Sequence, residues 1–178
     1  MCAVCPSWLS FILYNPIRKA LTDRRKVLEE SGITSDSVVL EVGSGNGFLT
    51  EALAGVCRRV YAVELQGGMV RKLRKRISRF GETVRVIQGD IVSIELDEGV
   101  ADVCLLYYCF HEVSSQEEAA ARIGRAVRKG GTLAIYEPTV EVRRADMKRT
   151  VSLFEKMGFH MEQERSGAFT RFARMRKV

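Results

Sequence analysis

Hydrophobic and polar positions along this chain follow two alternating patterns. Short runs rich in branched apolar residues are typical of buried strands, and they occur at 38–42, 59–65, 84–90, 101–110 and 131–138. Between and after these runs lie segments of helical spacing, at 48–56, 69–80, 115–128 and 143–157. This alternation predicts an α/β fold, doubly wound, with a mostly parallel sheet covered by helices on both faces.

The two ends of the chain add further elements to this alternation. Segments 159–165 and 169–177 alternate in polarity around a Ser-Gly-Ala turn at 166–168. They predict a C-terminal antiparallel hairpin, which brings the sheet to seven strands. A helix is also expected before the first strand, at about 17–31, ended by Gly32.

Length and composition fit one globular domain. The chain has 178 residues, of which 46% are hydrophobic, enough for a sizeable core. We expect a single domain over 1–178, with a core over 36–178 and a helical lead-in or lid over 1–35. The apolar stretch at 8–13 is too short for a membrane span and lacks the flanks of a signal peptide. A cytoplasmic chain without membrane contact is therefore expected.

The five cysteines do not form an obvious metal site. Cys104 and Cys109 lie in or beside an apolar run and are expected to be buried. Cys2 and Cys5 form a C-x-x-C pair, but zinc requires four ligands and the chain has only two histidines. We expect no bound metal, and two thiols in a segment that packs over the domain.

Three glycines follow the first predicted strand, at positions 43, 45 and 47 of VVLEVGSGNGFLT. In a doubly wound sheet, ligands bind beyond the carboxyl ends of the strands, where these glycines lie. The spacing is not the dinucleotide fingerprint G-x-G-x-x-G, because its third position is occupied by Phe48. The acid at Glu41 would repel a pyrophosphate but attract an amine, so a ligand with an amino-acid end fits better.

Acidic residues also end the next two predicted strands. Glu64 follows Gly43 by 21 residues (64 − 43), and a carboxylate there can accept both hydrogen bonds of a ribose diol. Asp90 can accept a hydrogen bond from an adenine amine, while Ile91 offers an apolar face to the ring. An amino acid, a ribose and an adenine in a row describe S-adenosylmethionine.

Five segments, taken in order over about 36–138, resemble the class I S-adenosylmethionine-dependent methyltransferase family: VVLEVGSGNGFLT, VYAVE, QGD, ADVCLLYYCFHEV and RKGGTLAIYEP. The start of the chain also resembles the lead-in of a small prokaryotic branch of that family. One departure is Glu41, where the family more often has Asp. The resemblance implies a Rossmann-like methyltransferase fold, S-adenosylmethionine as cofactor and S-adenosylhomocysteine as product.

The resemblance also implies the residues that hold the cofactor. They are Glu41, Gly43, Ser44, Gly45, Gly47, Glu64, Leu65, Gln88, Gly89, Asp90, Ile91 and Tyr107. Each has a simpler alternative: the glycines could serve only tight packing, Glu64 could be a solvated acid at a strand end, and Asp90 could cap a helix.

Methyl transfer is an in-line displacement, and it needs a base only when the nucleophile carries a proton. His111, after the fourth strand, is a candidate general base, and its alternative is a structural role in the loop. Tyr107 is a second candidate catalytic residue and, with Tyr108 and Glu137, a candidate for the substrate wall. Trp8, Phe11 and Tyr14 are candidates for a lid or for simple packing on the sheet edge.

The acceptor is the least determined part of the function. No large appended recognition domain is visible, which favours a small or medium-sized acceptor, and the Asn/Asp-Pro-Pro motif of base-amine methyltransferases is absent. The basic segment 71–79 could contact RNA or be a solvated helix face, so RNA methylation is an alternative. A non-catalytic module that binds S-adenosylmethionine is another alternative. A nicotinamide-dependent enzyme is disfavoured, because Phe48 replaces the third glycine of the dinucleotide fingerprint. The protein is expected to be a monomer or a homodimer.

Overall fold

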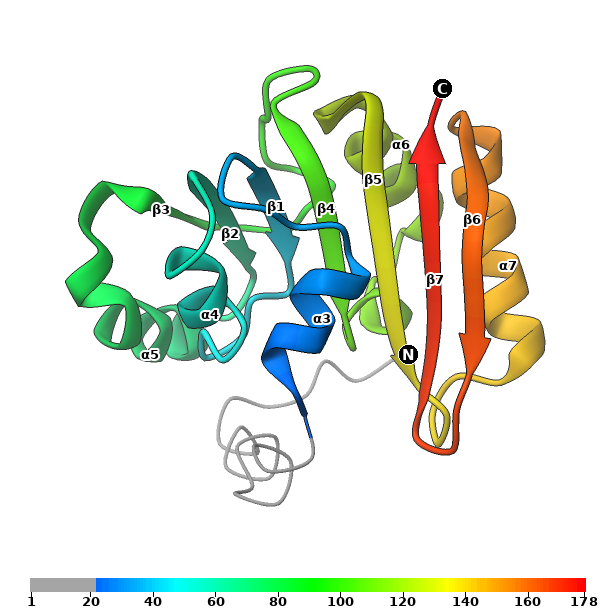
Figure 1. The fold of residues 1–178 in the computed structure, drawn as a ribbon, viewed down its shortest axis with the longest axis horizontal. Coiled ribbons are helices and arrows are strands. Elements are labelled where there is room, and N and C mark those ends of the chain that lie inside the picture. The colour runs from blue at the N-terminus through cyan, green and yellow to red at the C-terminus, as the bar shows by residue number, and fades with distance from the viewer. Residues whose placement is uncertain (1–21) are drawn as a thin grey trace.

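A computed structural model describes residues 22–178 as a seven-stranded sheet between two layers of helices (Figure 1). The strand order is β3-β2-β1-β4-β5-β7-β6. The strands are β1 Val38–Val42, β2 Arg59–Glu64, β3 Val84–Gln88, β4 Ala101–Tyr107, β5 Val127–Pro138, β6 Phe159–Ser166 and β7 Thr170–Lys177. The first five are parallel, and β7 runs antiparallel to both of its neighbours. The predicted fold and its seven strands are confirmed.

Helices cover both faces of the sheet. On one side lie α3 Arg24–Glu30, α4 Thr50–Ala54 and α5 Gly67–Ile77, and on the other α6 Gln116–Ala126 and α7 Arg144–Lys156. Two short 3₁₀ helices, η1 Ser78–Thr83 and η2 Phe110–Glu112, follow α5 and β4. The chain passes from β1 outward to β3 and then returns to the other side of β1 as β4. This switch point at β1 and β4 is where such sheets form a ligand crevice.

The central strands are apolar because both of their faces are covered. All five residues of β1 are buried, and Leu40 and Leu105 are fully removed from solvent. Burying a side chain of this size stabilises the fold by about 1.5–3 kcal/mol. Helix α5 turns Leu73 and Ile77 toward the same core, at the spacing of one helical turn.

Three strand boundaries differ by two residues or more from those expected. Strand β3 stops at Gln88, because the chain turns at Asp90, whose carbonyl accepts the N–H groups of Ser93 and Ile94 at 2.9 and 3.0 Å. Strand β4 ends at Tyr107, because Tyr108 takes a positive φ of 55° that breaks the extended backbone. Strand β5 begins earlier than predicted, at Val127, which pairs with the start of β4.

Most helix ends were predicted one to three residues too far out, although α5 begins two residues before its predicted start, at Gly67. Helix α6 shows one reason. Its predicted end at residue 128 is wrong, because Val127 already pairs with Ala101 in the sheet and the helix ends at Ala126. Ser115 is the N-cap residue of α6, but its side chain makes no capping hydrogen bond.

The lead-in is described only in part. Helix α3 begins at Arg24, where Asp23 caps it by accepting hydrogen bonds from two backbone N–H groups of its first turn. The earlier part of the expected 17–31 helix, the Cys2–Cys5 pair and the lid candidates Trp8, Phe11 and Tyr14 lie outside the described residues. From residue 22 onward, no helix is long and apolar enough to cross a membrane.

Candidate active site

The glycine loop between β1 and α4 divides into two kinds of position. Gly43, Gly45 and Gly47 all have a positive φ, of 71°, 56° and 84°. A Cβ at Gly43 would lie 2.5 Å from Cys109 Cβ, and one at Gly47 would lie 2.7 Å from Leu73 Cδ1. At Gly45, among the described residues, no atom comes nearer than 4.0 Å. Packing within the chain therefore requires Gly43 and Gly47, and Gly45 alone leaves space for something else.

Backbone hydrogen bonds fix this loop on the end of β2. The N–H groups of Gly43 and Ser44 both donate to Val63 O, at 3.0 and 3.1 Å. The hydroxyl of Ser44 donates to the same oxygen at 3.1 Å, and the residue is buried. Because its side chain already binds the protein, Ser44 presents backbone rather than hydroxyl to any ligand in the loop.

Glu64 joins the loop to the start of α5. Its Oε2 accepts the Gly45 N–H and its Oε1 accepts the Gln66 N–H, both at 2.8 Å. The residue is 6% exposed, which excludes the alternative of a solvated acid at a strand end. Each carboxylate oxygen can accept more than one hydrogen bond, so Glu64 is held in place with acceptor capacity left.

Glu41 lies buried beneath the loop. Thr50, in the first turn of α4, donates its hydroxyl to Glu41 Oε2 at 2.6 Å. Burial raises the pKa of Glu41 to about 8, the Thr50 hydrogen bond opposes this rise, and the charge of Glu64 adds to it. Glu41 is therefore largely neutral at pH 7, and a cation placed beside it would favour its ionised form. Thr50 was not identified from the sequence, where nothing connects it to Glu41.

The end of β3 lies against the end of β2. Gly89 donates its N–H to Glu64 O at 3.1 Å, which brings the predicted adenine side of the site next to the predicted ribose acid. Gln88 is exposed, and its Nε2 lies 3.2 Å from the position of a Cβ on Gly67. Leu65 is 49% exposed, an unusual position for leucine, at the same edge.

Asp90 begins the turn after β3. Its Oδ1 accepts the Val92 N–H at 3.1 Å, and its carbonyl accepts the N–H groups of Ser93 and Ile94 at 2.9 and 3.0 Å. The structural alternative for Asp90 is thus partly correct, although it caps a turn and not a helix. Ile91 is buried, with 4% of its surface exposed, so it can offer only an edge to a ligand.

Two tyrosines stack at the carboxyl end of β4. The rings of Tyr107 and Tyr108 lie 4.4 Å apart between centroids. Tyr108 donates its N–H to Tyr136 O at 2.8 Å, and its hydroxyl bonds to Thr170 Oγ1. The Tyr107 hydroxyl lies 3.4 Å from Thr22 Oγ1. These contacts hold a flat aromatic surface beside the glycine loop.

His111, in η2, is held by two acids. Its Nδ1 lies 2.5 Å from Glu137 Oε2 and its Nε2 lies 2.7 Å from Glu141 Oε2. Its backbone N–H also donates to Glu137 Oε1 at 3.1 Å. Glu141 follows β5 in the chain and was not predicted, since no sequence motif relates it to His111.

This arrangement changes the expected role of His111. Burial lowers its pKa, but the hydrogen bond to Glu137 and the charges of Glu137 and Glu141 outweigh burial and raise the pKa to about 8. At pH 7 the ring is mostly an imidazolium that donates from both nitrogens. A protonated ring cannot accept a proton, so the geometry disfavours the general-base prediction and favours the structural alternative.

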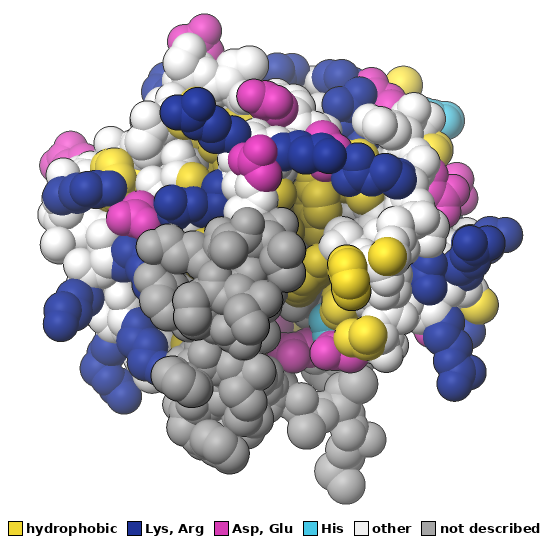
Figure 2. Space-filling view, turned by 60° about the horizontal axis from the view of Figure 1, so that its bottom comes forward, with side chains coloured by type: hydrophobic (Ala, Val, Ile, Leu, Met, Phe, Trp, Pro, Cys, Tyr) yellow, Lys and Arg dark blue, Asp and Glu magenta, His cyan; other side chains and the backbone are white. Residues whose placement is uncertain are grey.

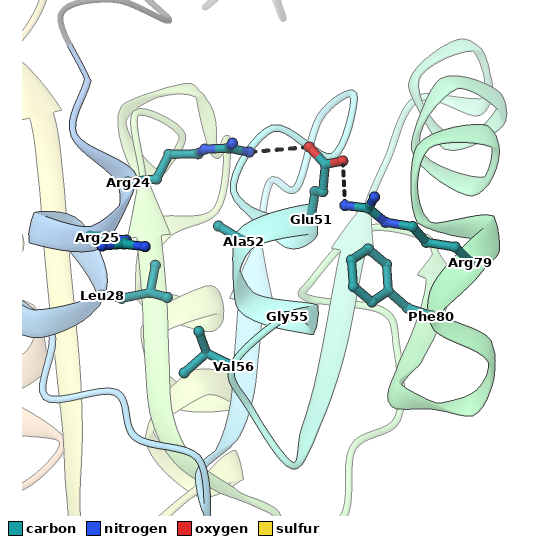
Figure 3. A pocket seen from close by; sticks show the side chains of 9 residues that line it. All are labelled: Arg24, Arg25, Leu28, Glu51, Ala52, Gly55, Val56, Arg79 and Phe80. Atoms are coloured by element: carbon teal, nitrogen blue, oxygen red, sulfur yellow. Dashed lines mark hydrogen bonds and ion pairs between the residues drawn. The ribbon is translucent and has the colours of Figure 1, made fainter.

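A hollow of about 350 Å³ lies on the α3–α4–η1 side of the molecule (Figure 3). It is lined by Arg24, Arg25, Leu28, Glu51, Ala52, Gly55, Val56, Arg79 and Phe80. In Figure 3, Glu51 bridges Arg24 and Arg79, each at 3.2 Å. None of the predicted cofactor residues lines this hollow, so it is a feature separate from the glycine loop.

Known methyltransferases resemble this chain over the part that contains the glycine loop. A model of the methyltransferase domain matches residues 40–135. An uncharacterized methyltransferase of Geobacillus sp. strain WCH70 is 28% identical over 80% of this chain and 66% of its own length. A ribosomal RNA small subunit methyltransferase of Arabidopsis thaliana is 38% identical over 53% of this chain and 25% of its own length. The chain thus spans two thirds or less of these relatives.

A solved structure shares the whole fold. The crystal structure of a SAM-dependent methyltransferase from Aquifex aeolicus has a TM-score of 0.86, with 23% identity, over 98% of this chain and all of that one. The family match covers more than half of the 178 residues and includes β1, the glycine loop, β2, β3 and β4. The chain belongs to the class I S-adenosylmethionine-dependent methyltransferase family.

Proposed function

We propose that this chain binds S-adenosylmethionine across the carboxyl ends of β1, β2 and β3 and methylates an acceptor placed beside β4 and β5. The observation that carries the proposal is an open glycine position, Gly45, at the same sheet edge as two buried acids, Glu41 of β1 and Glu64 of β2. Gly45 has open space where a side chain would stand, Glu64 holds its N–H at 2.8 Å, and Glu41 lies buried beneath the loop.

Each group in this arrangement suits one part of the cofactor. The neutral Glu41 carboxyl, with a pKa of about 8, would ionise beside the ammonium of the methionine end. Glu64 would accept the ribose hydroxyls with the acceptor capacity that Gly45 and Gln66 leave. Gln88, Gly89, Asp90 and Ile91 would border the adenine, and Leu65 would cover its edge. These assignments are proposals.

The bound cofactor supplies an electron-poor methyl group for in-line displacement. The chain then has to orient the acceptor and exclude water, and it need not provide a base unless the acceptor carries a proton. We propose that the stacked pair of Tyr107 and Tyr108 forms the acceptor wall. His111 would act as a positioning residue that ties η2 to β5 through Glu137. The role of residues 1–35 as a lid stays a proposal.

A small or medium-sized acceptor stays the first candidate, and a monomer or homodimer the expected state. RNA is a second candidate. It is favoured by the relative named a ribosomal RNA small subunit methyltransferase, which is 38% identical over 53% of this chain. It is also favoured by the basic face of α5.

A labelled-methyl screen tests the proposal. The protein is incubated with cofactor labelled in the methyl group, together with fractionated small molecules or RNA. We expect label to pass to one class of acceptor, and not with Gly45→Val, in which the loop is blocked. If the wild type binds S-adenosylhomocysteine but no fraction receives label, the chain is a non-catalytic binding module and the proposed function is wrong.

A further inference from the structure

The positive charge of the chain is concentrated on α5 and the η1 turn that follows it. Between residues 65 and 81 there are six Lys or Arg residues and no Asp or Glu. The whole chain has 28 basic and 22 acidic residues, an excess of 28 − 22 = 6. The excess of one segment thus equals the excess of the protein, and the rest of the chain is balanced. Such a distribution is the electrostatic pattern expected of a surface that binds a polyanion.

The structure presents these charges outward. Helix α5 buries Met69, Val70, Leu73 and Ile77, and it leaves Arg71, Arg74 and Lys75 exposed. None of these three cations forms an ion pair with a carboxylate of residues 22–178. Elsewhere many exposed arginines are neutralised: Arg128 lies 2.6 Å from Asp102. The charges of Arg71, Arg74 and Lys75 are therefore available to a partner.

This face adjoins the proposed cofactor site. Leu73 of α5 packs on Gly47, and Arg76 donates to Asn46 Oδ1 at 3.4 Å, so the helix lies directly against the glycine loop. The Arg71 guanidinium lies 3.8 Å from a Cβ position on Gly67, at the start of the helix next to the end of β2. Figure 2 shows Lys and Arg side chains on the left flank, the side on which α5 lies in Figure 1, as well as on the top and right of this view.

The hollow beside η1 does not account for this charge. Its arginines Arg24 and Arg79 are already neutralised by Glu51, each at 3.2 Å, and Arg79 also lies over the ring of Phe80 at 4.8 Å. A phosphate there would meet a carboxylate. Arg71, Arg74 and Lys75 of α5 have no such carboxylate neighbour among residues 22–178.

We propose that the face formed by Arg71, Arg74 and Lys75 of α5 binds the phosphate backbone of an RNA chain. A row of separated, solvated cations on a helix suits a repeating phosphate better than a single small anion, because each phosphate contact releases counterions independently. The inference goes beyond the proposed cofactor site and rests on separate residues. It also connects the second candidate acceptor to a specific surface.

Two matched charge reversals test this face. Arg71→Glu/Lys75→Glu changes two exposed cations one turn apart on α5, and Arg144→Glu/Lys148→Glu makes the same change of charge on α7. Binding of a labelled single-stranded RNA is followed by fluorescence anisotropy from about 50 to 200 mM salt. We expect the α5 variant to bind at least about tenfold more weakly, with the slope of log affinity against log salt reduced by about 1 to 2. The α7 variant should change affinity by less than about threefold.

Several outcomes would overturn the proposal. The first is no RNA binding by the wild type at the lowest salt, and the second is an equal loss in both variants, which would indicate only net charge. A third is binding to anionic phospholipid vesicles, but not to RNA, that depends on Arg71 and Lys75. Calorimetry with S-adenosylhomocysteine on each variant serves as the control for folding. It also separates the two claims, since the RNA face can fail while cofactor binding persists.

Discussion

At the scale of single residues, the three glycines of the loop do different work. Gly43 and Gly47 have protein atoms where a Cβ would lie, 2.5 and 2.7 Å away, whereas Gly45 has none within 4.0 Å among the described residues. This difference could not be predicted from the sequence, because the contacting residues, Cys109 and Leu73, come from distant parts of the chain. The structure therefore shows that Gly43 and Gly47 are needed for packing of the loop, whereas Gly45 leaves open space.

This division predicts different effects of the same substitution. Gly45→Ala and Gly47→Ala both place a side chain at positive φ, which costs about 1 to 2 kcal/mol. Gly47→Ala must also displace Leu73, so it should lower the free energy of unfolding by about a further 1 to 3 kcal/mol. Urea denaturation of both variants measures the difference. Equal stabilities would contradict the packing role of Gly47.

Glu41 predicts a pH dependence of stability without cofactor. Its pKa is raised from 4.5 to about 8 by burial, so the folded state binds a proton that the unfolded state has lost between these values. Stability should therefore fall as pH rises from about 4.5 to 8. Glu41→Gln keeps an acceptor for Thr50 but cannot titrate. Between these pH values the free energy of unfolding of the variant should therefore fall by several kcal/mol less than that of the wild type. Thermal melts of both proteins at pH 5 and pH 8 measure this difference. An equal loss of stability in the wild type and the variant would contradict the prediction.

At the scale of elements, His111 connects three segments that meet at the carboxyl edge of the sheet. Through Glu137 and Glu141 it ties η2 to the end of β5 and to the loop after it. The sequence placed His111 near the site, but only the folded chain shows that both ring nitrogens are engaged. Strand edges and helix ends were likewise set by contacts, such as Val127 with Ala101, that local patterns do not contain.

The His111 bridge can be measured by titration. The chain has two histidines, so the ring protons of His111 can be followed by NMR, and we expect a midpoint near pH 8. Glu141→Gln should lower this midpoint toward 6.5, because one of the charges that stabilise the imidazolium is lost. The raised pKa also means that the bridge stabilises the fold below pH 6.5 and that this contribution is lost as pH rises through 8. An unshifted midpoint in the variant would show that the bridge does not form in solution.

At the scale of the whole molecule, the parallel sheet could be predicted from alternating strands and helices, and the closing hairpin from its turn. The switch between β1 and β4 follows from that topology and places Gly45, Glu41 and Glu64 at one edge. The family resemblance also predicted that the cofactor residues lie at this carboxyl edge of the sheet. The acceptor side could not be predicted as well, because the contacts of Tyr108 with Thr170 and of His111 with Glu141 arise only through the fold.

The measurement that tests the central claim most directly is calorimetric titration with S-adenosylhomocysteine. The wild type should bind it, Gly45→Val should not bind detectably because the side chain fills the open position, and Glu64→Ala should bind more weakly. Arg144→Glu on α7 serves as the control that leaves binding unchanged. If Gly45→Val and Glu64→Ala, both still folded, bind with the affinity of the wild type, the cofactor does not lie in the glycine loop.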